Sequence, residues 1–211
     1  MRIIVFEGTF KTTTFINRLV VGLSSKHDVY ILGFNETLNT KLPGINYVGL
    51  GSNSSWFTFI KRSLQLRGFN FLKQLELFGL LLKREKKKII ASNLQLAIDA
   101  IQPDIIHFQW VGVLSYLENL KLSKKTKTVF SQRGFHINVR PFVDANNMNF
   151  LKEIFPKIDG FHSVSKAIRE KSKEIADDLT EVVKEQGKSA IKMALEGLKN
   201  ARETLNNIGK K

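Results

Sequence analysis

The chain has 211 residues, enough for one domain with a sizeable core or for one domain with an appendage. It contains no cysteine, which excludes disulfides, thiolate nucleophiles and cysteine-based metal sites and fits a reducing, cytoplasmic compartment. The formal net charge of +14 favours a polyanionic partner, such as nucleic acid, anionic lipid headgroups or phosphorylated sugars, over a surface charged only for solubility.

Short β-branched runs alternate with helical patterns in chain order. Residues 2–6 form the first predicted strand and lead through a glycine-containing turn into a helix predicted over residues 13–25. The apolar residues that recur on one face of this helix are Phe15, Leu19, Val20 and Leu23. The remaining strands are predicted at residues 28–34, 45–51, 103–110, 126–134 and 159–165. A long helical region, residues 54–101, precedes the fourth strand, and we expect breaks near Gly68 and around residues 83–88.

Strands that alternate with helices predict an α/β fold, with a Rossmann-like parallel sheet and helices on both faces. Four of the predicted strands finish in polar residues. These endings are Glu7-Gly8-Thr9, His107-Phe108-Gln109-Trp110, Gln132-Arg133-Gly134 and Ser163-Val164-Ser165. Because ligands of open parallel sheets bind beyond the carboxyl ends of the strands, the endings predict a binding cleft at one edge of the sheet.

Three side chains at these strand ends allow either a binding role or a structural one. Trp110 offers a flat face on which a sugar ring can stack, or it packs under a helix. His107 contributes to a ligand site, or it is a core histidine bonded to the backbone. Glu7 acts as a base or binds hydroxyl groups, or it forms an ion pair with Lys11.

The segment after the fifth predicted strand is basic. Arg133 and Arg140 can hold a phosphate or a carboxylate through bidentate hydrogen bonds, or they lie solvated on the surface. His136 and Asn138 alternate with apolar neighbours, so residues 135–139 are predicted to have one polar and one buried face.

Residues 56–88 mix aromatic and leucine side chains with cations, a combination that suits a helix lying on an anionic membrane. The residues expected to face such a membrane are Trp56, Phe57, Lys61, Arg62, Lys83, Arg84, Lys86, Lys87 and Lys88. The stripe of Phe71, Leu75 and Phe78 is expected to cover the sheet instead. The basic cluster can also belong to such a covering helix, with its lysines reaching out to solvent.

The composition changes near Lys166, after which Ala, Glu, Lys and Leu dominate. We divide the chain into a Rossmann-like domain at 1–170 and a helical tail at 171–211, with a joint near Gly187. The tail packs on the body or on another copy and so allows self-association, and it can be a fused, engineered or swapped element.

Several of these segments resemble the N-terminal domain of the family 4 retaining glycosyltransferases, which have the two-domain GT-B fold. "PDIIHFQW" is similar to the family's "pDvvHaHw", with Gln109 in place of a second histidine. Arg133-Gly134 stands where the family has "HG", and "IDGFHSVSKAIRE" is similar to its "aD.vi.vS" stretch. "HDVYILGF" is similar to "GHeVhvlt", and the resemblance covers residues 1–172.

The resemblance implies a single GT-B half that binds the acceptor of a sugar transfer, a glycan or a lipid-linked molecule in polysaccharide or glycolipid assembly. The implied acceptor-binding residues are Gly8, Thr9, Phe10, His107, Gln109, Trp110, Arg133, Gly134, His136, Asn138 and Ser165. The catalytic residues are unknown. Arg133 is a candidate but departs from the family's histidine, and His136, two positions on, is the other.

The family's pair of glutamates eight positions apart does not occur in the sequence, and no glycine-rich donor loop follows the sixth predicted strand. We therefore expect the nucleotide-sugar donor to need a second domain or subunit, and this chain to be inactive alone, with no cofactor or metal of its own. The alternative is a non-catalytic basic module that binds nucleic acid, an anionic membrane or a partner protein. No helix-turn-helix, RNA-recognition or zinc-finger signature supports nucleic acid. The expected location is cytoplasmic, peripheral at the inner face of the membrane.

Overall fold

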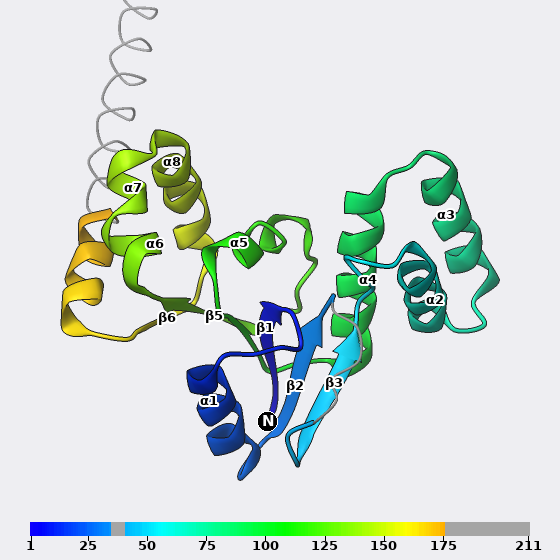
Figure 1. Ribbon diagram of the computed structural model, residues 1–211, viewed down its shortest axis with the longest axis horizontal. Coiled ribbons are helices and arrows are strands. Elements are labelled where there is room, and N and C mark those ends of the chain that lie inside the picture. The colour runs from blue at the N-terminus through cyan, green and yellow to red at the C-terminus, as the bar shows by residue number, and fades with distance from the viewer. Residues whose placement is uncertain (35–40, 176–211) are drawn as a thin grey trace, which may run out of the picture.

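The computed structural model describes residues 1–34 and 41–175, and its strands form one parallel sheet (Figure 1). The strand order is β3-β2-β1-β4-β5-β6. Their bounds are β1 Arg2–Gly8, β2 Asp28–Gly33, β3 Ile45–Gly49, β4 Ile105–Phe108, β5 Lys127–Gln132 and β6 Gly160–Ser163. The prediction of a Rossmann-like α/β fold is confirmed, although most strands end earlier than their apolar patterns suggest.

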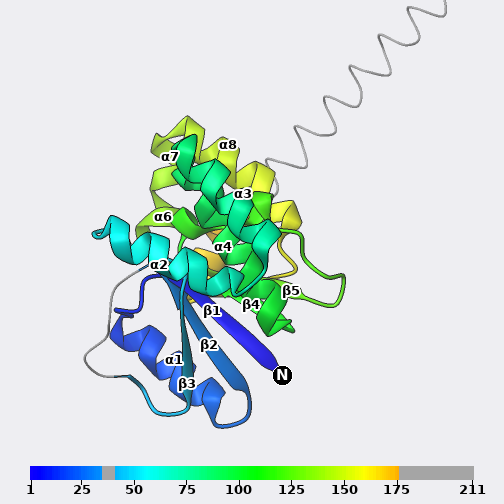
Figure 2. The same ribbon diagram turned by 90° about the vertical axis from the view of Figure 1, so that its right-hand side faces the viewer.

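Helices cover both faces of this sheet (Figure 1 and Figure 2). The α-helices are α1 Thr14–Ser24, α2 Trp56–Arg67, α3 Phe71–Leu82, α4 Lys86–Ile101, α5 Val111–Leu114, α6 Gly134–Asn138, α7 Arg140–Val143 and α8 Ala145–Ile154. Short 3₁₀ turns lie at Leu117–Asn119 and Phe155–Lys157. Central strand β1 alternates between two cores: Ile4 and Phe6 share a cluster with residues of α4, whereas Ile3 and Val5 share one with residues of α1.

The turn from β1 into α1 passes tightly over the end of β2. Gly8 has a φ of 88°, a conformation that favours glycine, and its carbonyl accepts the backbone N–H of Phe34 at 3.0 Å. A Cβ at Gly33 would lie 2.7 Å from the backbone carbon of Thr9. In α1 the buried residues are Ile16 and Val20. The buried face of α1 is therefore rotated relative to the predicted one. Val20 belongs to both faces, whereas Phe15 and Leu19 are not among the buried residues.

The predicted helical region breaks where expected. Gly68 caps α2 with a φ of 55°, and Arg84 separates α3 from α4 with a φ of 55°. Helices α2 and α3 form a hairpin that projects beyond the sheet edge and contacts α4 (Figure 1). We call this the projecting hairpin, residues 56–82.

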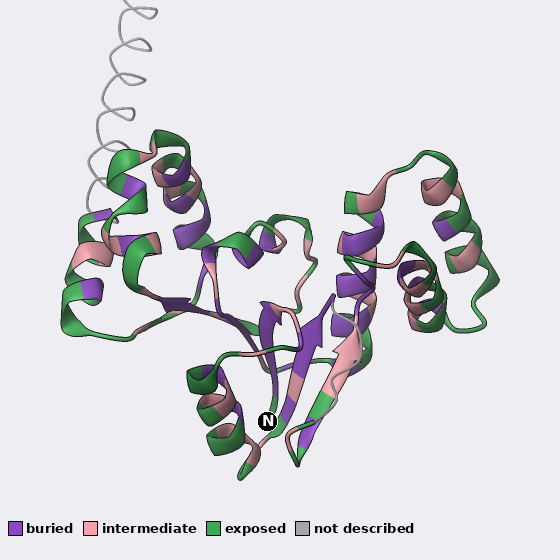
Figure 3. Cartoon of the chain, in the orientation of Figure 1, coloured by how far each residue is buried: buried purple, intermediate pink, exposed green. Residues whose placement is uncertain are grey.

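The prediction that the stripe on α3 covers the sheet is wrong. Phe71, Leu75 and Phe78 are 71%, 57% and 60% exposed, and Leu77 is the buried residue of α3. The physical reason is that α4 already occupies this part of the sheet face, and α4 carries a row of buried side chains (Figure 3). The α3 stripe is left on the outside.

A buried arginine joins the projecting hairpin to α4. Arg67 is 4% exposed, and its guanidinium donates to the Ser63 carbonyl at 2.9 Å and to Asn93 Oδ1 at 2.7 Å. It also donates to Ser92 Oγ at 2.9 Å and to the Lys73 carbonyl at 3.1 Å. These bonds span α2, the start of α3 and α4, so one side chain fixes three helices.

The segment after β5 is helical, and the predicted alternation over residues 135–139 is wrong. Gly134 opens α6 with a φ of 32°, and the Val139 N–H bonds to the Phe135 carbonyl at 3.1 Å. Helical spacing places Phe135 and Val139 on one exposed side, whereas Ile137 is fully buried.

A helix over residues 166–175 follows β6 and crosses the predicted boundary at residue 170. Ile168 and Ile175 are buried in the same core cluster as α4. Gln132 of β5 donates to Ser172 Oγ and accepts from Ser163 Oγ at 2.6 Å. The rest of the predicted tail, including the joint at Gly187, lies outside the described residues.

Candidate functional site

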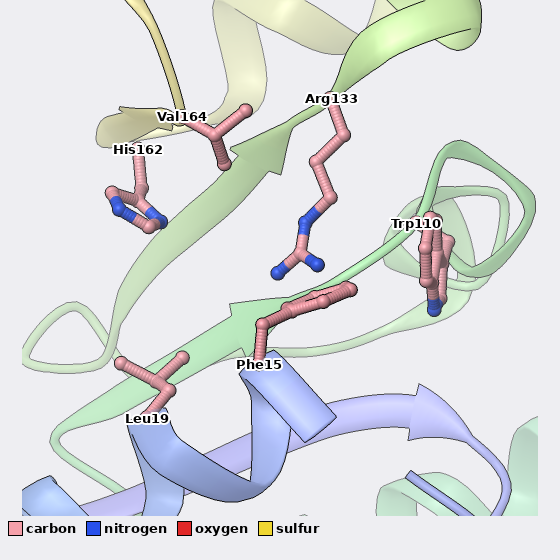
Figure 4. A pocket seen from close by; sticks show the side chains of 6 residues that line it. All are labelled: Phe15, Leu19, Trp110, Arg133, His162 and Val164. Carbon is pink, nitrogen blue, oxygen red and sulfur yellow. The ribbon is translucent and has the colours of Figure 1, made fainter. Parts of the chain in front are cut away.

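A pocket of about 470 Å³ lies beside α1 at the carboxyl ends of β4, β5 and β6 (Figure 4). Its lining residues are Phe15, Leu19, Trp110, Arg133, His162 and Val164. Phe15 and Leu19 come from α1, one helical turn apart, and the Arg133 side chain points between them and Trp110 (Figure 4). The volume and the largely apolar wall are typical of a small-molecule site.

Arg133 is held in place on three sides. Its guanidinium carbon lies 3.8 Å from the ring centroid of Phe15 and 5.1 Å from that of Trp110, both within cation–π range. Nη2 donates a hydrogen bond of 2.6 Å to Gln109 Oε1, and Gln109 itself is fully buried. The guanidinium is therefore pre-positioned in the pocket.

Glu7, at the end of β1, is buried next to this arrangement. Its Oε1 accepts a 3.3 Å hydrogen bond from Trp110 Nε1, which orients the indole. Burial raises the pKa of the Glu7 carboxyl, and the hydrogen bond from Trp110 and the charge of Arg133 only partly oppose that rise. Among the described residues Glu7 forms no ion pair, so the alternative that it pairs with Lys11 is not realised.

A hydrogen-bonded chain runs under the pocket from β4 to β6. His107 Nε2 lies 2.9 Å from Ser131 Oγ, which lies 3.2 Å from His162 Nδ1. Burial lowers the pKa of His107 to about 4, and the charges of His162 and Arg133 add to the effect. His107 is thus neutral near pH 7 and supports the pocket from below, while His162 lines it.

Several buried polar atoms at this edge have no hydrogen-bond partner within the described chain. They are Glu7 Oε2, Gln109 Nε2, Arg133 Nε, His136 Nδ1 and Asn138 Oδ1. Buried polar atoms are normally paired with protein or water, so such a cluster indicates a hydrated or ligand-binding region. The His136 ring lies 6.3 Å from that of Trp110, which places α6 at the rim.

The predicted acceptor-binding residues divide into three groups. Trp110 and Arg133 line the pocket, Gln109 is buried behind it and accepts a hydrogen bond from Arg133, and His107 lies beneath it. His136 and Asn138 lie on α6 next to it, and Gly134 starts that helix. Of the others, Gly8 ends β1 and Thr9 follows it in the turn, Phe10 is buried against Tyr47, and Ser165 caps the helix over 166–175 by accepting the Ile168 N–H.

Four lining residues were not among those predicted for the site: Phe15, Leu19, His162 and Val164. A weak signal existed for His162, because it lies one residue before the polar end of the sixth strand. Arg140 does not share the pocket with Arg133. It lines a separate depression of about 320 Å³ between α5 and α8, where its Nε lies 3.5 Å from Asp144 Oδ2.

The residues predicted to face a membrane lie on the other side of the molecule, on the projecting hairpin and the start of α4 (Figure 1). Trp56 and Phe57 are half or more exposed, and Trp56 stacks on Phe59. The exposed cations of this group are Lys61, Lys83, Arg84, Lys87 and Lys88. The half-buried ones are Arg62, bonded to Gln65, and Lys86, whose ammonium lies 5.6 Å from the Phe59 ring centroid.

The described helices include none that is both long and apolar enough to cross a bilayer. Comparison with known proteins adds no assignment, because neither a protein-family model nor a curated protein matches the chain. The chemistry of the site therefore rests on its geometry. A planar aromatic wall, a fixed guanidinium and a buried carboxyl can bind and orient a polar ring.

Proposed function

We propose that this chain supplies the acceptor-binding half of a retaining glycosyltransferase of GT-B type, which transfers a sugar from a nucleotide-sugar donor to a glycan or lipid-linked acceptor. The observation that carries the proposal is the pocket itself. Three segments that resemble the family, residues 103–110, 133–134 and 158–170, converge on its walls and rim. The donor is proposed to bind to a separate domain or subunit.

In this proposal the residues of the chain bind and orient the acceptor. Trp110 stacks against the apolar face of a sugar ring, because its indole is already fixed by the hydrogen bond to Glu7. Arg133 donates to oxygen atoms of the acceptor, and the rigid stacking on Phe15 means that little side-chain entropy is lost on binding. A catalytic part is proposed for Arg133, which lines the pocket, or for His136 on the adjacent α6.

The test is a binding experiment with the purified chain. Calorimetric titration should show saturable binding of at least one methyl glycoside of glucose, galactose, mannose or N-acetylglucosamine, and no comparable binding of UDP-glucose or GDP-mannose. Trp110→Ala should weaken that binding about tenfold, because a stacking contact and its buried area are lost. Trp56→Ala, on the projecting hairpin, is the matched control and should leave it unchanged. Tight nucleotide-sugar binding without glycoside binding would contradict the proposal.

We also propose that the chain acts at the cytoplasmic face of a membrane, where acceptors of polysaccharide and glycolipid assembly reside. The specific observation is the apolar face of the projecting hairpin. Phe57, Phe71 and Leu72 are each more than two-thirds exposed, and the same two helices carry the exposed cations Lys61 and Lys73. An apolar face with flanking cations suits the interface of an anionic bilayer.

A further inference from the structure

We infer that the ligand of the pocket carries an anionic group, a carboxylate or a phosphate, next to an apolar ring face, and that Arg133 binds this anion. The inference rests on the proposed function, because it assumes that the pocket takes the acceptor. It adds the chemical class of that acceptor, an acidic sugar or a sugar phosphate in place of a neutral sugar.

The first step is the charge of the pocket wall. Arg133 is the one permanently charged residue among the lining residues, and the others are aromatic or aliphatic apart from His162. Among the described residues, no carboxylate lies within ion-pair distance of the guanidinium. A cation in an apolar recess is unfavourable unless an opposite charge reaches it, and a ligand anion supplies that charge.

The second step is the geometry of the free donors. Nη2 is engaged by Gln109 and Nε is buried, whereas Nη1 makes no hydrogen bond within the described residues. The guanidinium thus offers its outer end to the pocket, and Figure 4 shows it over Phe15, with Trp110 on one side and His162 on the other. An anion bound end-on here lies next to the apolar part of the wall, Leu19 and Val164, which an apolar ring face of the ligand can contact.

The third step is the polar side chain that β6 adds to the pocket, His162. Ser131 Oγ lies within hydrogen-bond distance of His162 Nδ1, so the ring is oriented by a buried group, and no described residue bonds to its Nε2. His162 therefore presents a second polar atom from β6 while Arg133 approaches from the end of β5. Two oriented groups from the neighbouring strands β5 and β6 define a site for one charged group and one neutral hydroxyl of the same ligand.

Glu7 does not cancel this preference. It bonds to Trp110 rather than to Arg133, and burial raises the pKa of its carboxyl, which favours the uncharged form. The ionised form of Glu7 attracts Arg133 from beyond ion-pair distance, so it compensates the charge of the guanidinium only in part and leaves the outer end open to a ligand. A neutral sugar would satisfy the hydrogen bonds of Nη1 without adding to that compensation.

The experiment uses the fluorescence of Trp110. The chain has two tryptophans, so Trp56→Phe leaves Trp110 as the sole reporter. The probes are methyl glucoside, methyl glucuronide and glucose 6-phosphate, which share a ring and differ in charge. At least one of the two anionic probes should bind about tenfold tighter than the glucoside, and the preference should shrink as NaCl rises from about 0.05 to about 0.5 M. The anionic probe that binds more tightly shows whether the group that Arg133 recognises is a carboxylate or a phosphate.

Variants in the same background separate charge from fold. Arg133→Gln should remove the anion preference, and Arg133→Lys should retain part of it, because lysine keeps the charge without the planar fork. Arg140→Gln, which removes a cation from the neighbouring depression, should change nothing. Circular dichroism and thermal melting of each variant establish that it is folded.

The outcomes separate the two proposals. Equal affinity for all three probes, or an anion preference that survives in Arg133→Gln, overturns the inference and leaves the saccharide site intact. Absence of binding by every probe contradicts both the acceptor-binding function and the inference that rests on it. Inorganic phosphate that binds as tightly as glucose 6-phosphate also overturns the inference, because the ring would then add nothing.

Discussion

His107 is a buried titratable residue whose burial has a measurable consequence. It is 8% exposed, and its pKa falls from the ordinary value of 6.5 to about 4. The unfolded chain therefore takes up a proton at this residue as the pH falls below about 6.5, whereas the folded chain does not until about pH 4. Above about pH 6.5, His107 makes no pH-dependent contribution to the free energy of unfolding. As the pH falls from about 6.5 to about 4, its contribution lowers that free energy by up to about 3 kcal/mol.

The His107→Gln variant tests this effect, because the amide can still bond to Ser131 but does not titrate. Urea unfolding at pH 7 and pH 4.5 should show a smaller loss of stability on acidification than in the unaltered chain. Burial raises the pKa of Glu7, so that carboxyl contributes with the opposite sign, and the comparison between variants isolates His107. His27→Gln, just before β2, is the control. An identical pH dependence in both variants would contradict the assignment.

The site could be predicted in part from single residues. Gln109, Trp110 and Arg133 follow apolar runs, and the common edge of parallel strands brings such residues together. Phe15 and His162 could not be found this way. Phe15 reaches the pocket because α1 is rotated so that Ile16 faces the core, and His162 does so because the register of β5 and β6 sets it beside Ser131. Both depend on packing that the local pattern does not contain.

Among the elements, the projecting hairpin is joined to α4 by the hydrogen bonds of one buried side chain, Arg67. Arg67→Met removes the hydrogen bonds to Ser63, Ser92, Asn93 and the Lys73 carbonyl and leaves buried acceptors unpaired. We expect the free energy of unfolding to fall by about 3 kcal/mol. The four lost bonds to a charged group are worth about 1.5 kcal/mol each, and the removed desolvation cost of the buried guanidinium offsets about half of their sum. Hydrogen exchange should rise over residues 56–82 more than in β1.

A matched control is Lys61→Met, an exposed position on the same hairpin that should stay within about 0.5 kcal/mol of the unaltered chain. An equal loss of protection in the hairpin and in β1 would show that the two unfold together and that Arg67 does not act locally. The order of the strands and of the helices up to α4 could be predicted from the sequence, as could the breaks near Gly68 and around residues 83–88. The exposure of the apolar residues of α3 could not be predicted. Their spacing indicates an apolar face, but it does not indicate that α4 already covers the part of the sheet on which this face would pack.

At the scale of the whole molecule, charge and exposed apolar area coincide on the projecting hairpin and the start of α4. Sedimentation should show the full chain bound to phosphatidylserine-containing vesicles and not to phosphatidylcholine vesicles, with affinity falling as salt rises. The triple variant Lys83→Gln, Lys87→Gln, Lys88→Gln should weaken binding on the order of a hundredfold, since each cation near such a surface is worth about 1 kcal/mol.

The control removes cations elsewhere: Lys124→Gln with Lys125→Gln, both exposed in the loop before β5, should have a clearly smaller effect per charge. Duplex DNA in the same salt series distinguishes the remaining alternative. Preference for DNA, with vesicles left unbound, would reject membrane association and support a nucleic-acid-binding module.

The central place of β1 has a consequence for how the chain is made. Its neighbours are β2 and β4, and the backbone N–H of Arg2 is paired with Asp104, 102 positions away. At about 5–20 residues per second, a ribosome needs seconds to extend the chain from the first strand to the fourth. During that interval one edge of β1 has no permanent neighbour, so a nascent chain halted before residue 105 presents an open sheet edge flanked by Ile4 and Phe6, the kind of surface that chaperones recognise.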